Sequence, residues 1–331
     1  MSEVQKTIKC SIVVRALNEG RYVRELFAVL KNQKCSFAFE IILVDSGSTD
    51  DTVKIAVEGD VDKILHIKKE DFTYGRALNR GIAAAEGEVI VALSAHCIPT
   101  AEDWLVNLLK PFNNSGLAYA YGRQIGIDEK RPNHPSTRYS ERRIFEKVFP
   151  LISSRRLNEP MMNNANSAFL KSWWERVEFC EDLPGLEDLD FARKIHQLGA
   201  VGAYVSDAVV YHLHDETNFK VFKRFFREEV AAIKILKMRR KPRLQIFFDF
   251  VRDYASDLAH VAAYRESYSR YFITITGYRF AQQYAIYLAH YGAPSRVLLD
   301  RLHNWILSVL TKGRSTMASL RSSREYQGLW I

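Results

Sequence analysis

The amino-terminal half of the chain alternates short apolar runs with amphipathic segments, and few folds accommodate that alternation. Four apolar runs have the length and composition of strands buried on both faces: residues 10–15 (CSIVVR), 40–44 (EIILV), 64–67 and 89–93. Between them lie segments with helical periodicity, at residues 22–32, 53–57 and 75–85. Strands that alternate with helices imply an α/β fold with right-handed crossovers between the strands.

The chain changes character after residue 217. Residues 1–217 hold 27 Lys and Arg against 31 Asp and Glu, a net charge of −4, whereas residues 218–331 hold 20 against 8, a net charge of +12. Strand-like runs also end there, so we expect an α/β domain over 1–217 and a basic helical region over 218–331. Breaks in that helical region are predicted near Pro242, Gly277, Gly292-Pro294 and Gly313.

The basic helical region is expected to contact something anionic. No zinc-finger, RNP or helix-turn-helix pattern is present, so nucleic acid is not the expected partner. An anionic membrane surface fits better, because basic residues flank a helical stripe of large apolar side chains. The stripe consists of Phe219, Phe222, Phe226, Val230 and Ile233. The same stripe could instead pack on the rest of the chain, and the region could equally support a homo-oligomer.

The expected compartment is the cytoplasm. The four cysteines are far apart and form no C-x-x-C pair, which indicates a reducing environment and no structural zinc. No stretch at the start has the pattern of a signal peptide, and the uncharged stretches are too short to span a bilayer.

Polar residues follow the first two predicted strands at their carboxyl ends, where open α/β sheets bind ligands. Arg15, Asn18 and Glu19 follow the first strand, and Asp45 and Ser46 follow the second. Carboxylates accept hydrogen bonds from base N–H groups and ribose hydroxyls, so these residues fit a nucleoside, although any one could be a helix cap. The chain contains neither G-x-G-x-x-G nor G-x-x-x-x-G-K-S/T, which argues against a Rossmann site and a P-loop.

A glycine turn opens the predicted helix at residues 75–85. Arg76 and Asn79 lie in its first turns, where backbone N–H groups and a guanidinium can hold a diphosphate. Arg76 on a solvated face is the alternative.

Two further stretches carry groups suited to catalysis. In "LEDLDFARK", Glu187 and Asp188 begin a predicted helix, where they could cap it or present a general base to a cleft. In "VVYHLH", His212 and His214 lie on one side of a strand end, and His96 ends another predicted strand. Three histidines near one edge could bind a divalent metal.

The order of these stretches resembles the family-2 glycosyltransferases of the GT-A fold, and more narrowly their bacterial rhamnosyltransferase-type members. The resemblance covers roughly residues 8–230. It rests on "VDSGSTD", "KEDFTYGRALNRG", "LSAHCIPTAEDWL", "YGRQ", "NNANSAFLKSWWERV", "LEDLDFARK" and "VVYHLHDETNFKVFKRFF" in this order. It implies a mixed sheet flanked by helices, followed by the helical region.

The resemblance also implies roles for individual residues. Asp188 would be the catalytic base, and the strand ends would hold the donor nucleotide. The nucleotide set is Arg15, Asn18, Glu19, Asp45, Ser46, Arg76, Asn79 and Ser94. A second set is expected to contact the donor sugar or the acceptor: Glu187, Asn164, Asn166, Arg123 and Trp174. Core packing is equally open for Trp174. Residues 125–160 are expected to form a loop or lid near the acceptor.

The family usually binds Mg²⁺ or Mn²⁺ through a D-x-D motif, whose place is taken here by Ser94-Ala95-His96. Three interpretations follow. His96 could bind the metal together with His212 or His214, which would favour Mn²⁺ over Mg²⁺. His96 could instead contact the diphosphate, with Arg76 replacing the metal, or activity could have been lost. The intact "LEDLD" and "VYHLH" stretches argue against loss.

The sequence therefore predicts an inverting glycosyltransferase that uses a UDP- or dTDP-sugar. Its expected acceptor is a growing polysaccharide or a lipid-linked oligosaccharide, at the inner face of the cytoplasmic membrane. An inactive sugar-nucleotide-binding scaffold of a polysaccharide assembly complex is the alternative. A nucleotidyltransferase is disfavoured, because "RALNEGRY" lacks the Gly-rich basic loop that such enzymes place after the first strand.

Overall fold

The computed structural model of the chain describes residues 8–113, 116–127, 137–263 and 268–292, with backbone only at 268–270. Two compact units are present, one formed by the chain up to residue 137 with residues 144–214, the other by residues 138–143 with the chain from residue 215. The expected division after residue 217 lies close to the second of these borders. The inclusion of residues 138–143 in the second unit has no signal in the sequence.

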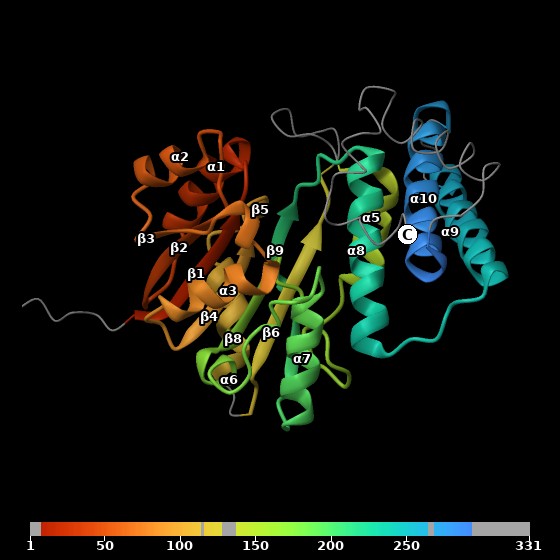
Figure 1. Ribbon diagram of the computed structural model, residues 1–331. Helices are drawn as coiled ribbons and strands as arrows, with labels where there is room; N and C mark the ends of the chain where they lie inside the picture. Colours follow the sequence, from red (N-terminus) through yellow and green to blue (C-terminus); the bar gives the residue numbers. More distant parts are fainter. Residues whose placement is uncertain (1–7, 114–115, 128–136, 264–267, 293–331) are drawn as a thin grey trace, which may run out of the picture. The chain divides into compact units, whose positions relative to one another are not determined.

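A nine-stranded mixed sheet forms the first unit, in the order β3-β2-β1-β4-β8-β6-β9-β5, with β7 paired to β9 (Figure 1). The strands are β1 (Ile8–Ala16), β2 (Ala38–Asp45), β3 (Lys63–His66), β4 (Val89–Ser94), β5 (Cys97–Pro99), β6 (Tyr119–Ile125), β7 (Arg155–Arg156), β8 (Asn166–Leu170) and β9 (Gly202–His212). The four predicted strands are confirmed as β1 to β4, which pair in parallel. β8 runs antiparallel to β4 and β6, and β9 runs parallel to β6.

Helices cover both faces of the sheet, as strands buried on both sides require. The helices of the first unit are α1 (Gly20–Lys31), α2 (Thr52–Glu58), α3 (Tyr74–Ala83), α4 (Trp104–Leu109), α6 (Lys171–Trp174) and α7 (Glu187–Gln197), with 3₁₀ turns η1 (Lys69–Asp71) and η2 (Lys110–Asn113). Ile12 and Val14 of β1 pack with α1, α2 and α4, whereas Val13 packs on the other face with α3 and α7. This alternation is the period of two that a strand imposes on its side chains.

Strand directions bring distant polar residues to one edge of the sheet. Arg15 pairs with Ser94 and Ala16 with Asp45, so β1, β2 and β4 end together. Because β8 is antiparallel, it begins at this same edge, where Asn166 pairs with Leu93. β6 and β9 also end there.

The segment expected to be a loop near the acceptor, residues 125–160, contains regular structure. α5 (Tyr139–Val148) and the short strand β7 lie within it. Residues 128–136 of this segment lie outside the described residues.

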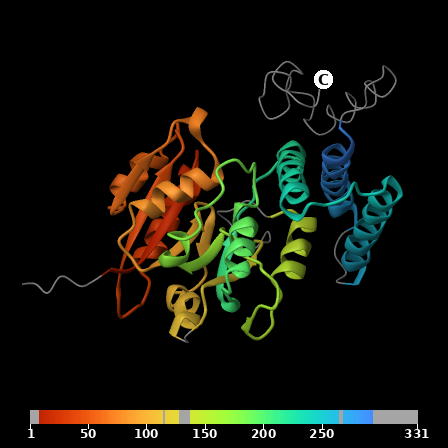
Figure 2. The same ribbon diagram turned by 60° about the horizontal axis from the view of Figure 1, so that its bottom comes forward.

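The second unit contains α8 (Asn218–Leu236), α9 (Arg243–Ala263) and α10 (Tyr268–Tyr291), which lie side by side (Figures 1 and 2). The break predicted near Pro242 is confirmed, because α9 begins directly after it. The break predicted at Gly277 is wrong, since this glycine lies inside α10. A Cβ there would come within 2.6 Å of the Asn218 Nδ2, so the glycine permits close contact with the start of α8. Gly292 has φ of +69° directly after α10, while Pro294 and Gly313 fall outside the described residues.

Of the stripe predicted on α8, Phe222 is buried and the other four residues are half-buried. The Phe222 ring lies 5.9 Å from that of Tyr284 on α10. Among the helices that the structure describes, none combines the length and apolar character needed to cross a bilayer.

Asn166 at the start of β8 holds the middle of the sheet together. Its Nδ2 donates to the backbone oxygens of Arg123 and Ala208, at 3.1 and 2.8 Å, and its Oδ1 accepts a hydrogen bond from Trp104 Nε1 at 3.1 Å. The side chain is fully buried. Asn166 was expected to contact a sugar, and the structure corrects this, because all its polar atoms are bonded inside the protein.

We expect Asn166→Ala to lower the free energy of unfolding by at least about 3 kcal/mol, since each of three buried partners loses its hydrogen bond at a cost of about 1–3 kcal/mol. Urea denaturation followed by circular dichroism measures the change. The exposed Asn113 is the matched control, and Asn113→Ala should change the value by less than about 0.5 kcal/mol. Equal stability of the two variants would contradict the structural role of Asn166.

Candidate active site at the carboxyl edge of the sheet

Asp188 lies in the first turn of α7, at the carboxyl edge of the sheet. α7 begins directly after Leu186, whose left-handed φ of 54° turns the chain sharply into the helix. The carboxylate of Asp188 accepts hydrogen bonds from the backbone N–H groups of Asn164, at 3.0 Å, and Leu189, at 2.8 Å. Burial and the neighbouring Glu187 carboxylate raise the pKa of Asp188 to about 7. The two hydrogen bonds lower this pKa, but by less than burial and Glu187 raise it. A half-buried carboxyl group with a pKa near neutrality is suited to general base catalysis.

Glu187, next to Asp188, is buried and fixed by two partners. Its Oε1 accepts from Arg15 Nη1 at 2.9 Å and from Asn164 Nδ2 at 3.3 Å. Arg15 also donates to the backbone oxygen of Tyr74 and lies 5.3 Å from the centre of its ring. Arg15, expected to bind the nucleoside, and Glu187 and Asn164, expected to contact a sugar, therefore hold one another. In the structure they position Asp188.

Three histidines, predicted as metal ligands, come together at the same edge. One ligand atom from each of His96, His212 and His214 lies within 4.8 Å of the others. The ring centres of His212 and His214 are 4.1 Å apart, and those of His96 and His212 are 5.2 Å apart. The ring of Phe145 stacks on that of His212, with the ring centres 5.2 Å apart.

Neighbouring groups fix the tautomers of two of these rings. Gln124 donates from Nε2 to Asn163 Oδ1 at 2.9 Å, which turns its Oε1 toward His212 Nδ1 at 2.7 Å. Glu19 Oε1 accepts from His96 Nδ1 at 2.9 Å. Both Nδ1 atoms therefore carry hydrogen, and the lone pair of each neutral ring lies on Nε2.

This arrangement fits a divalent metal ion. Histidine ligands in metal sites commonly donate their second ring N–H to a carboxylate or an amide oxygen, as His96 and His212 do here. Neutral imidazole suits transition metals better than Mg²⁺, which prefers oxygen ligands. Ser94, at the end of β4, adds a hydroxyl 3.2 Å from His96 Nε2.

The loops that follow β1 and β2 also lie at the carboxyl edge of the sheet. Asn18 has φ of 56°, and its Oδ1 accepts from the backbone N–H of Thr49 at 2.8 Å. Asp45 is buried and accepts from the N–H groups of Gly47 and Ser48, while His66 Nδ1 lies 3.4 Å from its Oδ2. These contacts join the two loops into a polar surface on which a nucleoside could lie. The hydroxyl of Ser46 is buried and lacks a hydrogen-bond partner among the described residues.

α3 holds two residues predicted to bind the nucleotide. The guanidinium of Arg76 forms an ion pair with Glu181 at 2.7 Å and donates to the backbone oxygen of Asp71. These bonds use two of its five N–H donors, so Arg76 can still face an anion.

Asn79 and Trp174, predicted to contact nucleotide and sugar, bind each other instead. Trp174 Nε1 donates to Asn79 Oδ1 at 2.9 Å, and Asn79 Nδ2 donates to the backbone oxygen of Phe179 at 2.9 Å. Both side chains are buried. This correction removes them from the candidate site and makes them the contact between α3 and α6.

Arg123, the remaining predicted sugar contact, is half-buried on β6 and donates from Nε to the Phe149 backbone oxygen at 3.4 Å. Gln124 and Asn163 entered the sequence analysis only as parts of the stretches "YGRQ" and "NNANSAFLKSWWERV", and His66 was not predicted as a site residue. His66 lies inside the predicted strand 64–67, whereas the observed strand β3 ends at this residue, so the prediction of the strand end missed it.

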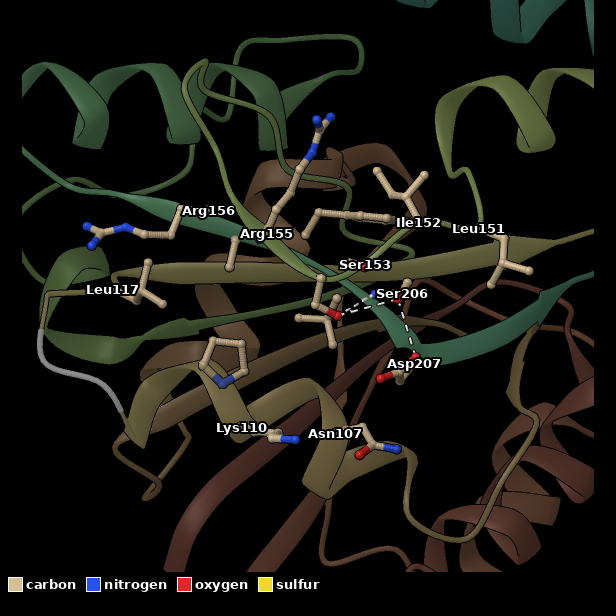
Figure 3. A pocket seen from close by; sticks show the side chains of 15 residues that line it. Asn107, Lys110, Leu117, Leu151, Ile152, Ser153, Arg155, Arg156, Ser206 and Asp207 are labelled. Carbon is tan, nitrogen blue, oxygen red and sulfur yellow. Dashed lines mark hydrogen bonds between the residues drawn. The ribbon is translucent and has the colours of Figure 1, made fainter.

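A cavity of about 810 Å³ lies elsewhere in the first unit, beside the start of β9 (Figure 3). Arg155, Arg156 and Lys110 surround it, and Ser154 and Asp207 bond to Ser206 within it. None of the residues predicted for catalysis or binding lines this cavity. The candidate active site is therefore built on the open edge of the sheet.

Comparison with known proteins identifies the family of the chain. The pattern of "Glycosyl transferase family 2" matches residues 11–177, about half of the chain. The chain is 28% identical over 224 residues to the O-antigen chain rhamnosyltransferase RfbN of Salmonella typhimurium, which covers 66% of the chain and 71% of the relative. It is 29% identical over 192 residues to the O-antigen chain rhamnosyltransferase WbaN of Salmonella anatum. That match covers 56% of the chain and 60% of the relative. Less than two thirds of this relative is therefore covered.

Solved structures share the fold. A mannosyltransferase from Pyrobaculum calidifontis, in complex with GDP-Man and Mn²⁺, superposes with a TM-score of 0.52 at 18% identity, covering 97% of this chain and 82% of its own. Glucosyl-3-phosphoglycerate synthase from Mycobacterium tuberculosis, in complex with Mn²⁺, UDP and phosphoglyceric acid, superposes with a TM-score of 0.51 at 17% identity, covering 70% and 80%. The chain therefore belongs to glycosyl transferase family 2 and has the GT-A fold, and it is similar to proteins named rhamnosyltransferases.

Proposed function

We propose that the protein is an inverting glycosyltransferase that moves a sugar from a nucleotide-diphosphate donor to a hydroxyl group of a glycan acceptor. The observation that carries this proposal is the carboxylate of Asp188, which two backbone N–H groups hold at the edge where the histidines and the strand-end loops meet. Its raised pKa gives it the basicity that proton abstraction near neutral pH needs.

In the proposed reaction Asp188 takes the proton from the acceptor hydroxyl while that oxygen bonds to the anomeric carbon. The bond between this carbon and the diphosphate oxygen breaks, and the nucleoside diphosphate leaves with the electron pair. A single displacement inverts the anomeric centre. Glu187, Arg15 and Asn164 keep the Asp188 carboxylate in place during proton transfer.

The donor nucleotide is proposed to lie on the joined loops after β1 and β2. Asn18 and Asp45 offer hydrogen-bonding groups for the base and ribose there, and Arg76 approaches the diphosphate from α3. Two structural relatives are complexes with GDP-Man or UDP, which supports a nucleotide-diphosphate donor. We propose a UDP- or dTDP-sugar as the donor.

His96, His212 and His214 are proposed to hold a divalent cation, with Mn²⁺ favoured over Mg²⁺. Such a cation supplies positive charge to the departing diphosphate. Glu19 and Gln124 orient the rings so that Nε2 of His96 and of His212 can act as ligands. The Mn²⁺ in the two solved complexes supports this assignment.

Rhamnose is the proposed sugar, and a growing polysaccharide or a lipid-linked oligosaccharide is the proposed acceptor. Both follow from the two relatives named O-antigen chain rhamnosyltransferases. A lipid-linked acceptor would lie at the inner face of the cytoplasmic membrane, so we place the enzyme there as a peripheral protein. The replacement of a carboxylate motif by Ser94-Ala95-His96 favours one other function, an inactive scaffold that binds sugar nucleotides.

Asp188→Asn tests catalysis against the scaffold function. We expect donor hydrolysis and transfer to fall by about 10²–10⁴-fold, the usual contribution of a general base, with nucleotide affinity unchanged. Asp190→Asn is the matched control, because Asp190 lies on the same helix and pairs with Lys194 at 2.7 Å. Wild-type protein that binds nucleotide but never consumes a donor would support the scaffold instead.

The raised pKa of Asp188 predicts a pH dependence of the transfer rate. Only the carboxylate form accepts a proton, so kcat should fall about tenfold per pH unit below pH 7 and level off above it. Glu187→Gln removes the like charge, which lowers the pKa of Asp188 and should move the acid limb to lower pH. A limb at the same pH in both proteins would show that another group controls it.

The metal site is tested by calorimetric titration of UDP and dTDP with EDTA, Mg²⁺ or Mn²⁺. We expect Mn²⁺ to strengthen binding more than Mg²⁺, and His96→Ala to remove the Mn²⁺ effect. His196→Ala on α7 is the control and should leave the effect intact. Affinity that EDTA does not alter would mean that Arg76 and its neighbours hold the diphosphate without a metal.

A further inference from the structure

Four large apolar side chains of α9, in the second unit, are exposed. Leu244, Phe247, Phe248 and Val251 are 71%, 58%, 63% and 43% exposed. Their spacing of i, i+3, i+4 and i+7 places them on one side of the helix. Single exposed apolar residues are ordinary, but a contiguous set of this kind marks a surface that contacts something apolar.

The acidic residues of α9 point the other way, into the second unit. Asp257 is fully buried and accepts two hydrogen bonds from Arg279 on α10, at 2.7 and 2.9 Å. Asp249 pairs with Lys241 at 3.2 Å and with Arg252 at 2.8 Å. The packed side of α9 also contains the buried apolar residues Ile246 and Val261, so the four exposed apolar residues form a second apolar surface on the opposite side.

A dense group of cations precedes this apolar surface. Residues 234–243 contain six Lys and Arg and no acidic residue. Arg239, Arg240 and Arg243 are exposed, and the last two lie 5.0 and 4.8 Å from the centre of the Tyr291 ring. These stacking contacts fix two guanidinium groups at the amino-terminal end of α9.

We propose that this surface binds an anionic lipid bilayer. The α9 face comprises Leu244, Phe247, Phe248 and Val251 together with Arg239, Arg240 and Arg243. Its apolar side chains enter the headgroup layer while its cations contact lipid phosphates, as in interfacial amphipathic helices. Charge complementarity selects lipid over a second copy of this basic chain, because two such faces would bring like charges together. The proposed location at the cytoplasmic membrane gives this lipid binding its biological purpose, and for that purpose alone the inference rests on the proposed function.

Co-sedimentation with vesicles tests the inference on the full chain. Wild-type protein should bind vesicles of phosphatidylcholine and phosphatidylglycerol in equal parts, and bind phosphatidylcholine alone weakly. Phe247→Ser/Phe248→Ser should weaken binding by at least about tenfold. Arg239→Gln/Arg240→Gln should weaken it by about 30-fold, since each cation near an anionic surface contributes about fivefold.

The first unit offers matched controls. Leu151 is 74% exposed, and Arg155 and Arg156 are an exposed arginine pair. Leu151→Ser and Arg155→Gln/Arg156→Gln should leave vesicle binding unchanged. Donor hydrolysis without lipid should persist in every variant, which separates loss of membrane binding from loss of the proposed activity.

Three outcomes would overturn the inference. The first is wild-type protein that hydrolyses donor but does not sediment with anionic vesicles. The second is binding that depends on Arg239 and Arg240 but not on Phe247 and Phe248, which would mean surface attraction without insertion. The third is a dimer, seen by analytical ultracentrifugation, that dissociates in Phe247→Ser/Phe248→Ser while vesicles are ignored, which would assign the face to a second copy.

Discussion

Arg15 and Glu187 are 172 positions apart in the chain, and their ion pair at 2.9 Å joins the end of β1 to the first turn of α7. Both groups are largely buried, so removal of either would leave a charge without its partner, at a cost of about 3–5 kcal/mol. Asn164 bonds to Glu187 through its side chain and to Asp188 through its backbone. The position of the candidate base thus depends on an ion pair in which the base takes no part.

The histidine cluster differs in charge from a carboxylate motif. Three neutral imidazoles leave the charge of a bound divalent cation uncompensated, whereas carboxylates would cancel part of it. In the proposed site the cation would therefore attract the diphosphate more strongly than it would with carboxylate ligands. A negative charge nearby is that of Glu19, which bonds to the far nitrogen of His96. Imidazole ligands also bind Zn²⁺ more tightly than Mn²⁺ in the general order of affinities. The metal that occupies such a site would therefore depend on supply as well as on its ligands.

The sequence predicted β1 to β4 because strands buried on both faces appear as continuous apolar runs. It also predicted which residues lie at the strand ends, since that depends only on where each run stops. It did not predict which of these polar side chains face inward. Asn79 bonds to Trp174, 95 positions away, and Asn166 to Trp104, 62 positions away, and no local pattern reveals such pairs. The break predicted at Gly277 was wrong for the same reason. The Asn218 side chain that requires a glycine there comes from another helix, and no local pattern reveals it.

The amide of Gln124 has a consequence that extends beyond the orientation of one ring. Its nitrogen bonds to Asn163 and its oxygen to His212, so it connects the loop at residues 163–164 to the histidine cluster. That loop also supplies the backbone N–H that holds Asp188. The group that would accept the proton and the groups that would face the leaving diphosphate are thus linked through a single planar amide. Three hydrogen bonds and one peptide link therefore connect His212 to Asp188, so a displacement of the histidine would also move the candidate base.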